Sequence, residues 1–367
     1  MSDSSVSRPP APTSALDVIV VGGGQAGLAV AYHLSRRGLR FLVLDSGTEI
    51  GHTWRGRWDS LCLFTPAEYC SLPGMPYPAP AGTYPTKDEV ADYLESYATK
   101  FELPVLLNAA VRRLTHDGGV FHLETSQGSL CARQVVVATG PFQRPAVPAT
   151  AQQFAAEVVQ LHSAEYLRPS DVPQGRVLVV GAGNSGLQIA AELAATREVH
   201  VAVGSKQTMV PQRPFGRDLF WWLTKTGLLT RPADSPIARF LRRRGGDLVI
   251  GTTTDSLRAA GVSLHGRLIR AEGRAAQLAD GGRLEVDAVV WATGFRPDYS
   301  WIDLDGVWDG RQVVHQRGRT RTPGLWFIGL PWQHTRGSAL LGFVKDDAEW
   351  VTGQLQASHA ATDAPAA

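Results

Sequence analysis

Short apolar runs that end in glycine recur along the chain. The run Leu16–Val21 is rich in valine and isoleucine and leads into Gly22, and an Ala/Leu-rich stretch follows at 28–34. Continuous apolar runs of this length are typical of buried parallel strands, and the Ala/Leu stretch is typical of a helix. We therefore expect a strand at 16–21, a helix that stops at Gly38, and a second strand at Phe41–Leu44.

The same pattern returns further along the chain. The apolar run Val177–Val180 is followed by a helical stretch at 187–195 and a strand near 199–203. Each unit then leads to an apolar strand that ends in Ala-Thr-Gly, at 138–140 and at 292–294. Gly22 lies 117 residues before Thr139, and Gly181 lies 112 residues before Thr293. This matched spacing indicates an internal repeat on the scale of a domain.

Both units place the pattern G-x-G-x-x-G between strand and helix, as Gly22, Gly24 and Gly27 and as Gly181, Gly183 and Gly186. The first glycine makes the tight turn, the second lets a pyrophosphate approach the backbone N–H groups, and the third lets helix and strand pack closely. In this context the pattern is the fingerprint of a dinucleotide-binding unit. The predicted fold is α/β, with two Rossmann-like dinucleotide-binding domains.

The two units differ at the end of their second strand. Asp45 lies 18 residues after Gly27, where a carboxylate accepts hydrogen bonds from ribose hydroxyls and repels a 2′-phosphate. The equivalent position of the second unit is Gly204, followed by Ser205 and Lys206, which can hold that phosphate. Lys206 is alternatively an ordinary solvated charge. The second site is therefore expected to prefer NADPH, with NADH as the alternative.

Composition excludes several other classes of protein. With 367 residues and 44% hydrophobic side chains, the chain can form two or three domains with full cores. A net charge of +2 argues against nucleic acid as a partner. Cys62, Cys70 and Cys131 form no C-x-x-C pair, which argues against a dithiol reductase. We expect no metal site, no membrane partner and no targeting segment, and hence a cytoplasmic protein.

Several further segments carry a resemblance to a known family. They are 54–66, which contains Trp54-Arg55-Gly56-Arg57-Trp58-Asp59-Ser60-Leu61, then Leu72–Pro78, Tyr84–Lys87 and Trp291–Pro297. With the two fingerprints, these segments resemble the flavin-containing monooxygenases, especially their short bacterial members and the plant auxin-forming enzymes. The resemblance covers roughly residues 16–350.

The chain departs from the family pattern in three places. The signature before the second fingerprint keeps His162 and Tyr166, whereas Ala156 and Val158 stand where Phe and Gly are expected. Phe64 stands at the place of an Asn that is thought to assist the oxygenated flavin. The reductase-type Gly-Asp near the C-terminus is also absent from the sequence. No side chain can therefore be carried over as an oxygen-handling residue.

The resemblance implies FAD on the first unit and NADPH on the second. It implies a discontinuous FAD domain at 1–170 and 288–367, with an NADPH domain at 171–287 inserted and chain crossings at the two Thr-Gly pairs. The expected cofactor-binding residues come from the fingerprints and the matching segments: Gly22, Gly24, Gln25, Ala26, Gly27, Asp45, Trp54, Arg55, Thr139, Gly140, Gly181, Gly183, Asn184, Ser185, Gly186, Ser205, Lys206, Thr293 and Gly294.

The implied activity is monooxygenation of a small thioether, amine or ketone by O₂ and NAD(P)H, through a C4a-(hydro)peroxide of the flavin. The flavin itself does the chemistry, and Asp59, Arg55 and Phe64 are candidates to assist it. His162 is expected to have a structural hydrogen-bonding role, and the final helix is expected to begin at Gly337. Two alternatives stay open: a flavin NAD(P)H oxidase or reductase without oxygenation, and a non-enzymatic dinucleotide-binding sensor.

Overall fold

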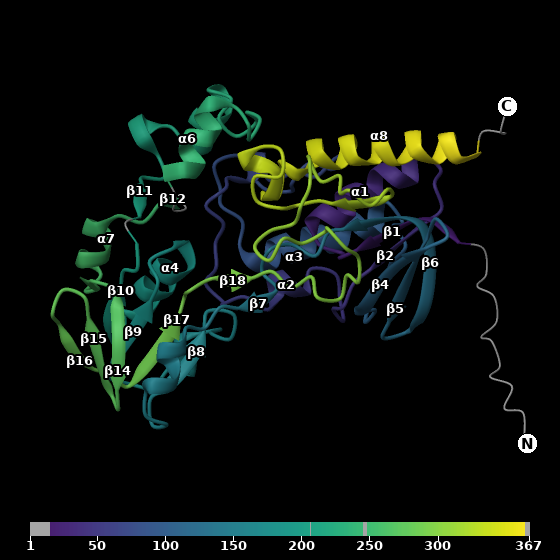
Figure 1. Cartoon of the computed structure of the whole chain (residues 1–367). Helices are drawn as coiled ribbons and strands as arrows, with labels where there is room; N and C mark the ends of the chain where they lie inside the picture. The colour runs from purple at the N-terminus through teal and green to yellow at the C-terminus, as the bar shows by residue number, and fades with distance from the viewer. Residues whose placement is uncertain (1–14, 206, 245–247, 364–367) are drawn as a thin grey trace, which may run out of the picture.

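The computed structural model describes residues 15–205, 207–244 and 248–363. Its two largest sheets lie side by side, and the C-terminal helix α8 (Val344–Asp363) lies along the first of them (Figure 1). None of the described helices is long and apolar enough to cross a bilayer.

The first sheet has the strand order β3-β2-β1-β6-β5-β4, and β19 also pairs with β6. Strands β3, β2, β1, β6 and β19 run parallel, whereas β4, β5 and β6 form an antiparallel meander. The strands span Leu16–Val21 (β1), Phe41–Leu44 (β2), Val105–Leu106 (β3), Val111–Asp117 (β4), Val120–Thr125 (β5), Gly128–Val137 (β6) and Leu325–Phe327 (β19).

Alternate side chains of β1 enter different cores. Val18 and Val20 pack in one core with α1 (Gln25–Arg36), α3 (Lys87–Lys100) and α8. Ile19 and Val21 pack on the opposite face, where the meander and β19 contribute. Strand β1 is therefore covered on both sides, which is why its sequence is a continuous apolar run.

The second sheet is parallel throughout, with the order β13-β10-β9-β17-β8. Helices α4 (Asn184–Leu193) and α7 (Thr254–Ala259) pack on one face. The antiparallel meander β14 (Leu268–Glu272), β15 (Ala275–Leu278) and β16 (Arg283–Glu285) packs on the other. The sheet strands span Val159–His162 (β8), Arg176–Val180 (β9), Glu198–Ala202 (β10), Ser263–His265 (β13) and Ala288–Trp291 (β17).

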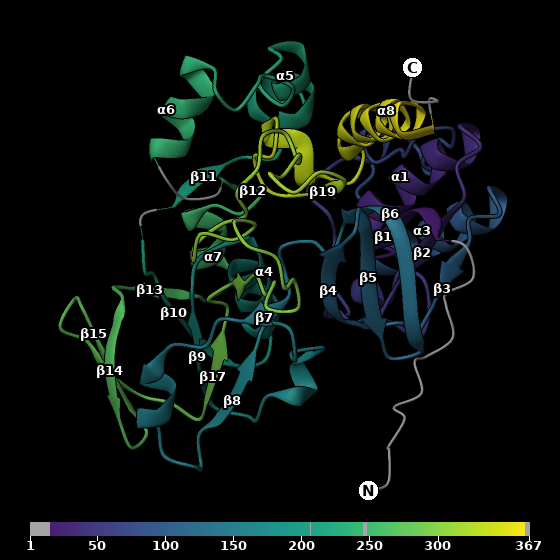
Figure 2. The ribbon, with the colours of Figure 1, turned by 45° about the vertical axis from the view of Figure 1, so that its right-hand side comes forward.

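A helical segment extends from the second sheet. It starts after β11 (Thr208–Val210), contains α5 (Leu219–Lys225) and α6 (Pro236–Arg244), and returns at β12 (Leu248–Ile250), which pairs parallel to β11. Figure 2 shows α5 and α6 beyond β11 and β12, on the same side of the molecule as α8.

Two connectors join the sheets. Their strands β7 (Arg144–Pro145) and β18 (Phe295–Arg296) pair antiparallel between the two sheets (Figure 1). Strands β8 and β17 belong to the second sheet, although the domain boundaries expected at 170 and 287 assign both to the first domain. The chain changes sheet at the connectors, close to the two Ala-Thr-Gly tripeptides.

The remaining helical elements are short. They are α2 (His52–Arg55) and the 3-10 turns Ala67–Tyr69, Ala149–Gln153, Pro169–Asp171, Pro214–Gly216 and Arg336–Ala339. The expectation that the final helix begins at Gly337 is wrong. A 3-10 turn capped by Thr335 occupies that position, and the helix begins at Val344 after an extended Leu340.

Candidate dinucleotide-binding sites

The first glycine of each fingerprint has a backbone conformation that favours glycine. Gly22 has a φ of 111° and Gly181 a φ of 114°. A Cβ atom on these residues would lie 2.5 Å and 2.2 Å from the carbonyl oxygens of Ala138 and Ala292, respectively. These alanines begin the two Ala-Thr-Gly tripeptides. Each tripeptide therefore lies against the loop of its own unit, which explains the matched spacing in the sequence.

The third glycine of each loop touches the first, whereas the second faces open space. A Cβ on Gly27 would lie 1.9 Å from the carbonyl oxygen of Gly22, and one on Gly186 would lie 2.2 Å from that of Gly181. Apart from the residues directly adjoining in the chain, no heavy atom of the described structure comes within 4 Å of a Cβ built on Gly24 or Gly183. The loops are thus tightly packed on one side and open on the side that faces the pyrophosphate in dinucleotide-binding loops of this type.

The helices after these loops begin without a side-chain cap. Neither α1 nor α4 has a capping side chain or an acidic residue in its first turn. The helices α3, α5 and α7, by contrast, are capped by Thr86, Asp218 and Thr253. The first backbone N–H groups of α1 and α4 therefore remain available to an anion. Gln25 and the buried Ala26 form the first turn of α1.

Asp45 lies beside the first loop, at the end of β2. Its carboxylate accepts hydrogen bonds from the backbone N–H of Gly23 at 2.6 Å and of Gly47 at 2.7 Å. The His52 imidazole lies 3.5 Å from the same carboxylate. The acid is therefore fixed at the edge of the loop, where the sequence predicts contact with a ribose.

The corresponding edge of the second loop carries an arginine that the sequence did not predict. Arg267 donates hydrogen bonds to the carbonyl oxygen of Gly204, from Nε at 3.1 Å and from Nη2 at 2.7 Å. Ser205 next to it is exposed and accepts a hydrogen bond from the Gln207 amide at 3.2 Å. Lys206 lies outside the described residues. Because β13 pairs with β10, the residues that follow β13 meet the loop that follows β10.

The Asn184 side chain holds a neighbouring strand. Its amide nitrogen donates to the carbonyl oxygen of Leu248 at 2.9 Å, and its amide oxygen accepts from the N–H of Ile250 at 3.0 Å. Of the two roles considered for this side chain, a bond to the pyrophosphate or support of the loop, the contacts match the second. Ser185 beside it is exposed.

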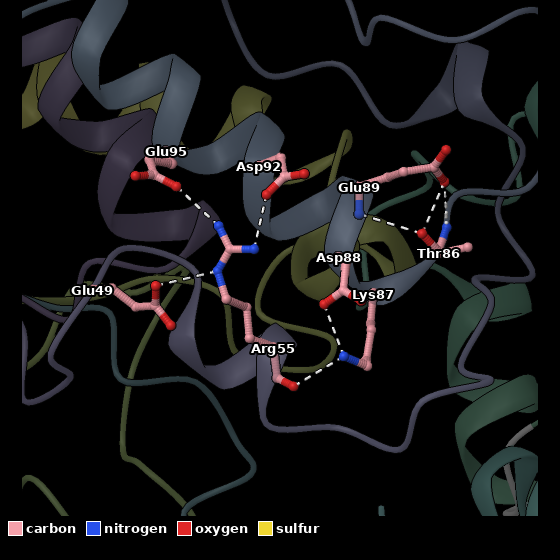
Figure 3. A network of polar contacts seen from close by, with 8 residues as sticks. All are labelled: Glu49, Arg55, Thr86, Lys87, Asp88, Glu89, Asp92 and Glu95. Atoms are coloured by element: carbon pink, nitrogen blue, oxygen red, sulfur yellow. Dashed lines mark hydrogen bonds and ion pairs between the residues drawn. The ribbon is translucent and has the colours of Figure 1, made fainter. Parts of the chain in front are cut away.

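The Arg55 guanidinium is part of an ion-pair network and is therefore not free to contact a cofactor phosphate (Figure 3). Its guanidinium lies 3.4 Å from Glu49, 2.8 Å from Asp92 and 2.9 Å from Glu95. Lys87 donates to the backbone carbonyl of Arg55 at 3.1 Å. Three carboxylates surround this cation, so a position on a cofactor phosphate has no support from the geometry. The network instead holds α2 against α3. Trp54 of α2 is half-buried against the core that α1, α3 and α8 form with the first sheet.

The other two candidates for assisting the flavin also have protein partners. Asp59 is half-exposed and pairs with Arg168 at 3.1 Å, so the arginine that it orients is neither Arg55 nor Arg57. Phe64 stacks on Phe220, with 6.1 Å between the ring centroids, and belongs to an aromatic cluster between the two parts of the chain. The Phe64 side chain has no polar group that could interact with an oxygenated flavin.

Arg57 is a half-buried cation at the connectors. Its guanidinium lies over the rings of Phe142 and Phe295, at 5.7 Å and 5.3 Å from their centroids. Burial lowers the pKa of this guanidinium, and among the described residues Arg57 makes no salt bridge. A desolvated cation of this kind favours an anionic ligand.

The threonines of the two Ala-Thr-Gly tripeptides form hydrogen bonds with residues of the connectors. Thr293 donates to the carbonyl oxygen of Ala146 at 2.6 Å, and the Thr139 hydroxyl accepts from the Gln143 amide at 2.8 Å. His162 is buried and contacts Gly294 through Nε2 at 3.0 Å. Its Nδ1 accepts from the N–H of Ala164, and burial lowers the pKa of the imidazole. These bonds give His162 a structural role. Gly140, like Gly294, has a positive φ.

The cysteines do not form a redox pair. Cys62, Cys70 and Cys131 are all free, and burial raises the pKa of each thiol. A thiol with a raised pKa is a poor nucleophile at neutral pH. No metal-binding group of acidic, histidine and cysteine side chains occurs within the described ranges.

Comparison with known proteins agrees with this geometry. Residues 19–215 match the family described as pyridine nucleotide-disulphide oxidoreductase. An uncharacterized CzcO-like oxidoreductase of Geobacillus kaustophilus is 45% identical over 342 residues, which are 93% of this chain and 98% of that protein. A probable indole-3-pyruvate monooxygenase of Arabidopsis thaliana is 31% identical, over 88% of this chain and 86% of that protein.

A solved structure gives the same result. The flavin-containing monooxygenase from Stenotrophomonas maltophilia matches with a TM-score of 0.79 and 33% identity, over 95% of this chain and 100% of that chain. The fold and the two loops thus define an oxidoreductase with a mixed α/β fold. The chain belongs to the pyridine nucleotide-disulphide oxidoreductase family and, within it, to the flavin-containing monooxygenases.

Proposed function

We propose that the protein is an NADPH-dependent monooxygenase that binds FAD at the Gly22–Gly27 loop and NADPH at the Gly181–Gly186 loop. One observation carries the proposal. Each loop leads into a helix that has no side-chain cap, and the second glycine of each loop faces open space. Those two features together form a site for a pyrophosphate. Bound FAD would supply hydride acceptance and oxygen activation, which no side chain provides.

We propose a domain arrangement that follows the strand pairing. The NADPH-binding domain would run from the first connector to the second, roughly 146–294, and the FAD-binding domain would comprise the residues on either side. These bounds differ from the expected boundaries at 170 and 287, because β17 pairs with β9 and β8 pairs with β17 in the second sheet. Two Rossmann-like domains, one inserted into the other, follow from this division.

The residues around each loop have distinct roles in the proposal. Asp45 would select an adenosine with a free ribose at the first loop, because its carboxylate repels a 2′-phosphate. Arg267 and Ser205 would hold the 2′-phosphate of NADPH at the second loop. Arg57 would meet anionic cofactor or substrate groups near the connectors, where both Thr-Gly pairs lie.

The proposed substrates are small thioethers, amines or ketones. The support is family membership, since one relative is named a probable indole-3-pyruvate monooxygenase, and indole-3-pyruvate carries a ketone group. The aromatic cluster of Phe64, Tyr69, Phe220 and Phe343 supplies an apolar surface between the two proposed domains. Water exclusion by such a surface is what productive oxygen transfer requires.

The test is a reduction and reoxidation experiment on the purified protein. Its absorbance spectrum should show bound flavin, NADPH should bleach that spectrum without O₂, and O₂ with a thioether, amine or ketone should yield oxygenated product. A protein without flavin would refute the assignment of FAD. A protein that binds flavin but does not oxidise NADPH would match the sensor alternative.

A second candidate, a flavin NADPH oxidase, rests on Phe64. This residue replaces the Asn expected near the oxygenated flavin, and its ring lies in an apolar cluster. An oxidase would consume NADPH and O₂ in equal amounts and release H₂O₂ in place of oxygenated product. Measuring H₂O₂ and product in one reaction separates the two functions.

A further inference from the structure

The chain is sharply divided in charge. Residues 213–244 carry eight basic side chains and two acidic ones, a net charge of +6. The remainder carries 28 basic and 32 acidic side chains, a net charge of −4. The basic residues of 213–243 are exposed. One segment of a nearly neutral protein is therefore strongly cationic, and this segment contains α5 and α6.

Helix α6 turns an apolar stripe outward. Ile237, Phe240 and Leu241 follow the i, i+3, i+4 spacing of one helix face and are 44%, 62% and 36% exposed. Ala238 alone among the residues 236–243 is buried. Arg239, Arg242 and Arg243 occupy the rest of the helix surface. The helix is thus amphipathic with its apolar face unpartnered.

A second exposed aromatic residue lies in the same segment of the chain. Phe215 is 95% exposed and has a φ of 54°, which a non-glycine residue adopts only when its surroundings hold it there. Its ring lies edge-on to Trp222, whose indole N–H donates to the carbonyl oxygen of Pro214 at 3.0 Å. An exposed aromatic side chain is therefore presented by a fixed turn, in the same cationic segment.

The inner side of the segment is attached to the rest of the chain. Ala233 donates to the carbonyl oxygen of His334 at 2.6 Å, and Gly337 donates to that of Leu229 at 3.0 Å. Leu219, Phe220 and Leu229 are buried in a common core with Ile250. Both views show α6 at the outer edge of the molecule, beyond β11 and β12 (Figures 1 and 2). The apolar stripe of α6 therefore lies on a segment that is attached to the rest of the protein.

We propose that residues 213–244 form a docking surface for an anionic lipid bilayer, with Phe215, Ile237, Phe240 and Leu241 inserted among the headgroups. A basic amphipathic helix with an aromatic and aliphatic face lies in the plane of such an interface. Anionic headgroups complement the net charge of +6. A nucleic acid would use the arginines and leave the apolar stripe in water, so the stripe favours lipid. The proposal goes beyond the reaction and does not depend on it.

Sedimentation with lipid vesicles tests this surface. The full protein should bind vesicles that contain phosphatidylglycerol at about 50 mM salt, bind neutral phosphatidylcholine vesicles at least about tenfold more weakly, and dissociate at about 500 mM salt. The double variant Ile237→Asp/Phe240→Asp should bind at least about tenfold more weakly. Arg239→Glu/Arg243→Glu should lose a similar factor, because each arginine near the surface contributes about fivefold.

Matched controls come from the β14 hairpin. Ile269 is 55% exposed, and Ile269→Asp together with Arg270→Glu should leave vesicle binding unchanged. Flavin absorbance and circular dichroism of every variant check that the fold is kept. The proposal is overturned by no binding at low salt, by equal binding to both kinds of vesicle, or by equal losses in the control. Binding to heparin that equals vesicle binding and is unaffected by Ile237→Asp/Phe240→Asp would identify a general polyanion site and would also overturn it.

Discussion

Gly24 and Gly183 occupy the same place in their loops, and alanine fits the backbone of both, with φ of −77° and −76°. We expect Gly24→Ala to fold normally and to be isolated without FAD, because the methyl group takes the space that the pyrophosphate approaches. Gly183→Ala should keep FAD and lose at least about tenfold in kcat/KM for NADPH. Flavin absorbance and the anaerobic rate of reduction measure the two effects.

Gly27→Ala is the control for these variants. Its Cβ would collide with the carbonyl oxygen of Gly22 at 1.9 Å, so this change should lower the free energy of unfolding by about 1–3 kcal/mol. Thermal unfolding distinguishes it from Gly24→Ala. A Gly24→Ala protein that retains a full complement of FAD would contradict the binding role of the loop.

Arg267 determines cofactor preference in our proposal. Arg267→Gln should raise KM for NADPH at least about tenfold, because a charge-assisted hydrogen bond to the 2′-phosphate is lost, and should leave KM for NADH unchanged. Steady-state kinetics with both cofactors measure this. Arg270→Gln is the matched control, since that side chain is exposed and, among the described residues, bonds only to Gln277 within its own hairpin. Equal losses with NADPH and NADH would show that Arg267 acts on folding or on another step.

The positions that the sequence predicts best are those with a local steric requirement. Gly22 must be glycine because of its positive φ, and Gly27 because a Cβ would collide with the carbonyl oxygen of Gly22, so a pattern over six residues reveals both positions. Arg267 has no such local signal, because its contact with Gly204 depends on β13 pairing with β10. Asn184 is similar, since its partners lie on β12. A tertiary contact of this kind cannot be found from spacing alone.

At the scale of elements, Arg55 joins α2 to α3 through three carboxylates (Figure 3). Arg55→Gln should lower the free energy of unfolding by about 1–2 kcal/mol, because the carboxylates then repel one another without a cation. Urea unfolding of the variant and of the wild type measures the difference. FAD content should stay close to that of the wild type once the variant is folded. A variant of full stability that loses FAD would instead restore a direct cofactor role for Arg55.

The central parallel strands β1, β9 and β17 were predictable because their residues are apolar on both faces. The strands β1 and β2 have the predicted bounds, β9 begins one residue earlier than predicted, and β10 lies one residue earlier at both ends. Strand β17 ends at Trp291, before the Ala-Thr-Gly tripeptide that the prediction included in it. The start of the last helix was not predictable in the same way. The Gly-Ser sequence at 337–338 is typical of a helix start, but the Ser338 hydroxyl accepts from the N–H groups of His334 and Thr335 and closes a tight turn.

At the scale of the molecule, stability should depend on pH through histidines that are buried or partly buried. Burial lowers the pKa of His33, His162, His315 and His334, so the native state keeps these imidazoles neutral. The unfolded chain binds protons below about pH 6.5. The free energy of unfolding is therefore highest above that pH and falls as the pH decreases.

Urea unfolding at about pH 7.5 and about pH 5.5 checks this dependence. The midpoint should be lower at the acidic pH. His162→Gln keeps a donor near the Gly294 carbonyl oxygen and removes one titrating group, so its midpoint should fall less over the same interval. An identical fall in both proteins would show that His162 does not contribute.

The pairing of β7 with β18 has a consequence for the exchange of parts between related proteins. Because these two strands are adjacent and antiparallel, the stretch between them, residues 146–294, begins and ends at neighbouring positions in the structure. A stretch with neighbouring ends can be cut out and replaced without displacing the chain that flanks it. Chimeras that join this chain to a relative at Pro145 and Phe295 should therefore fold, and each would acquire the nicotinamide preference of the donor while keeping the recipient's flavin site.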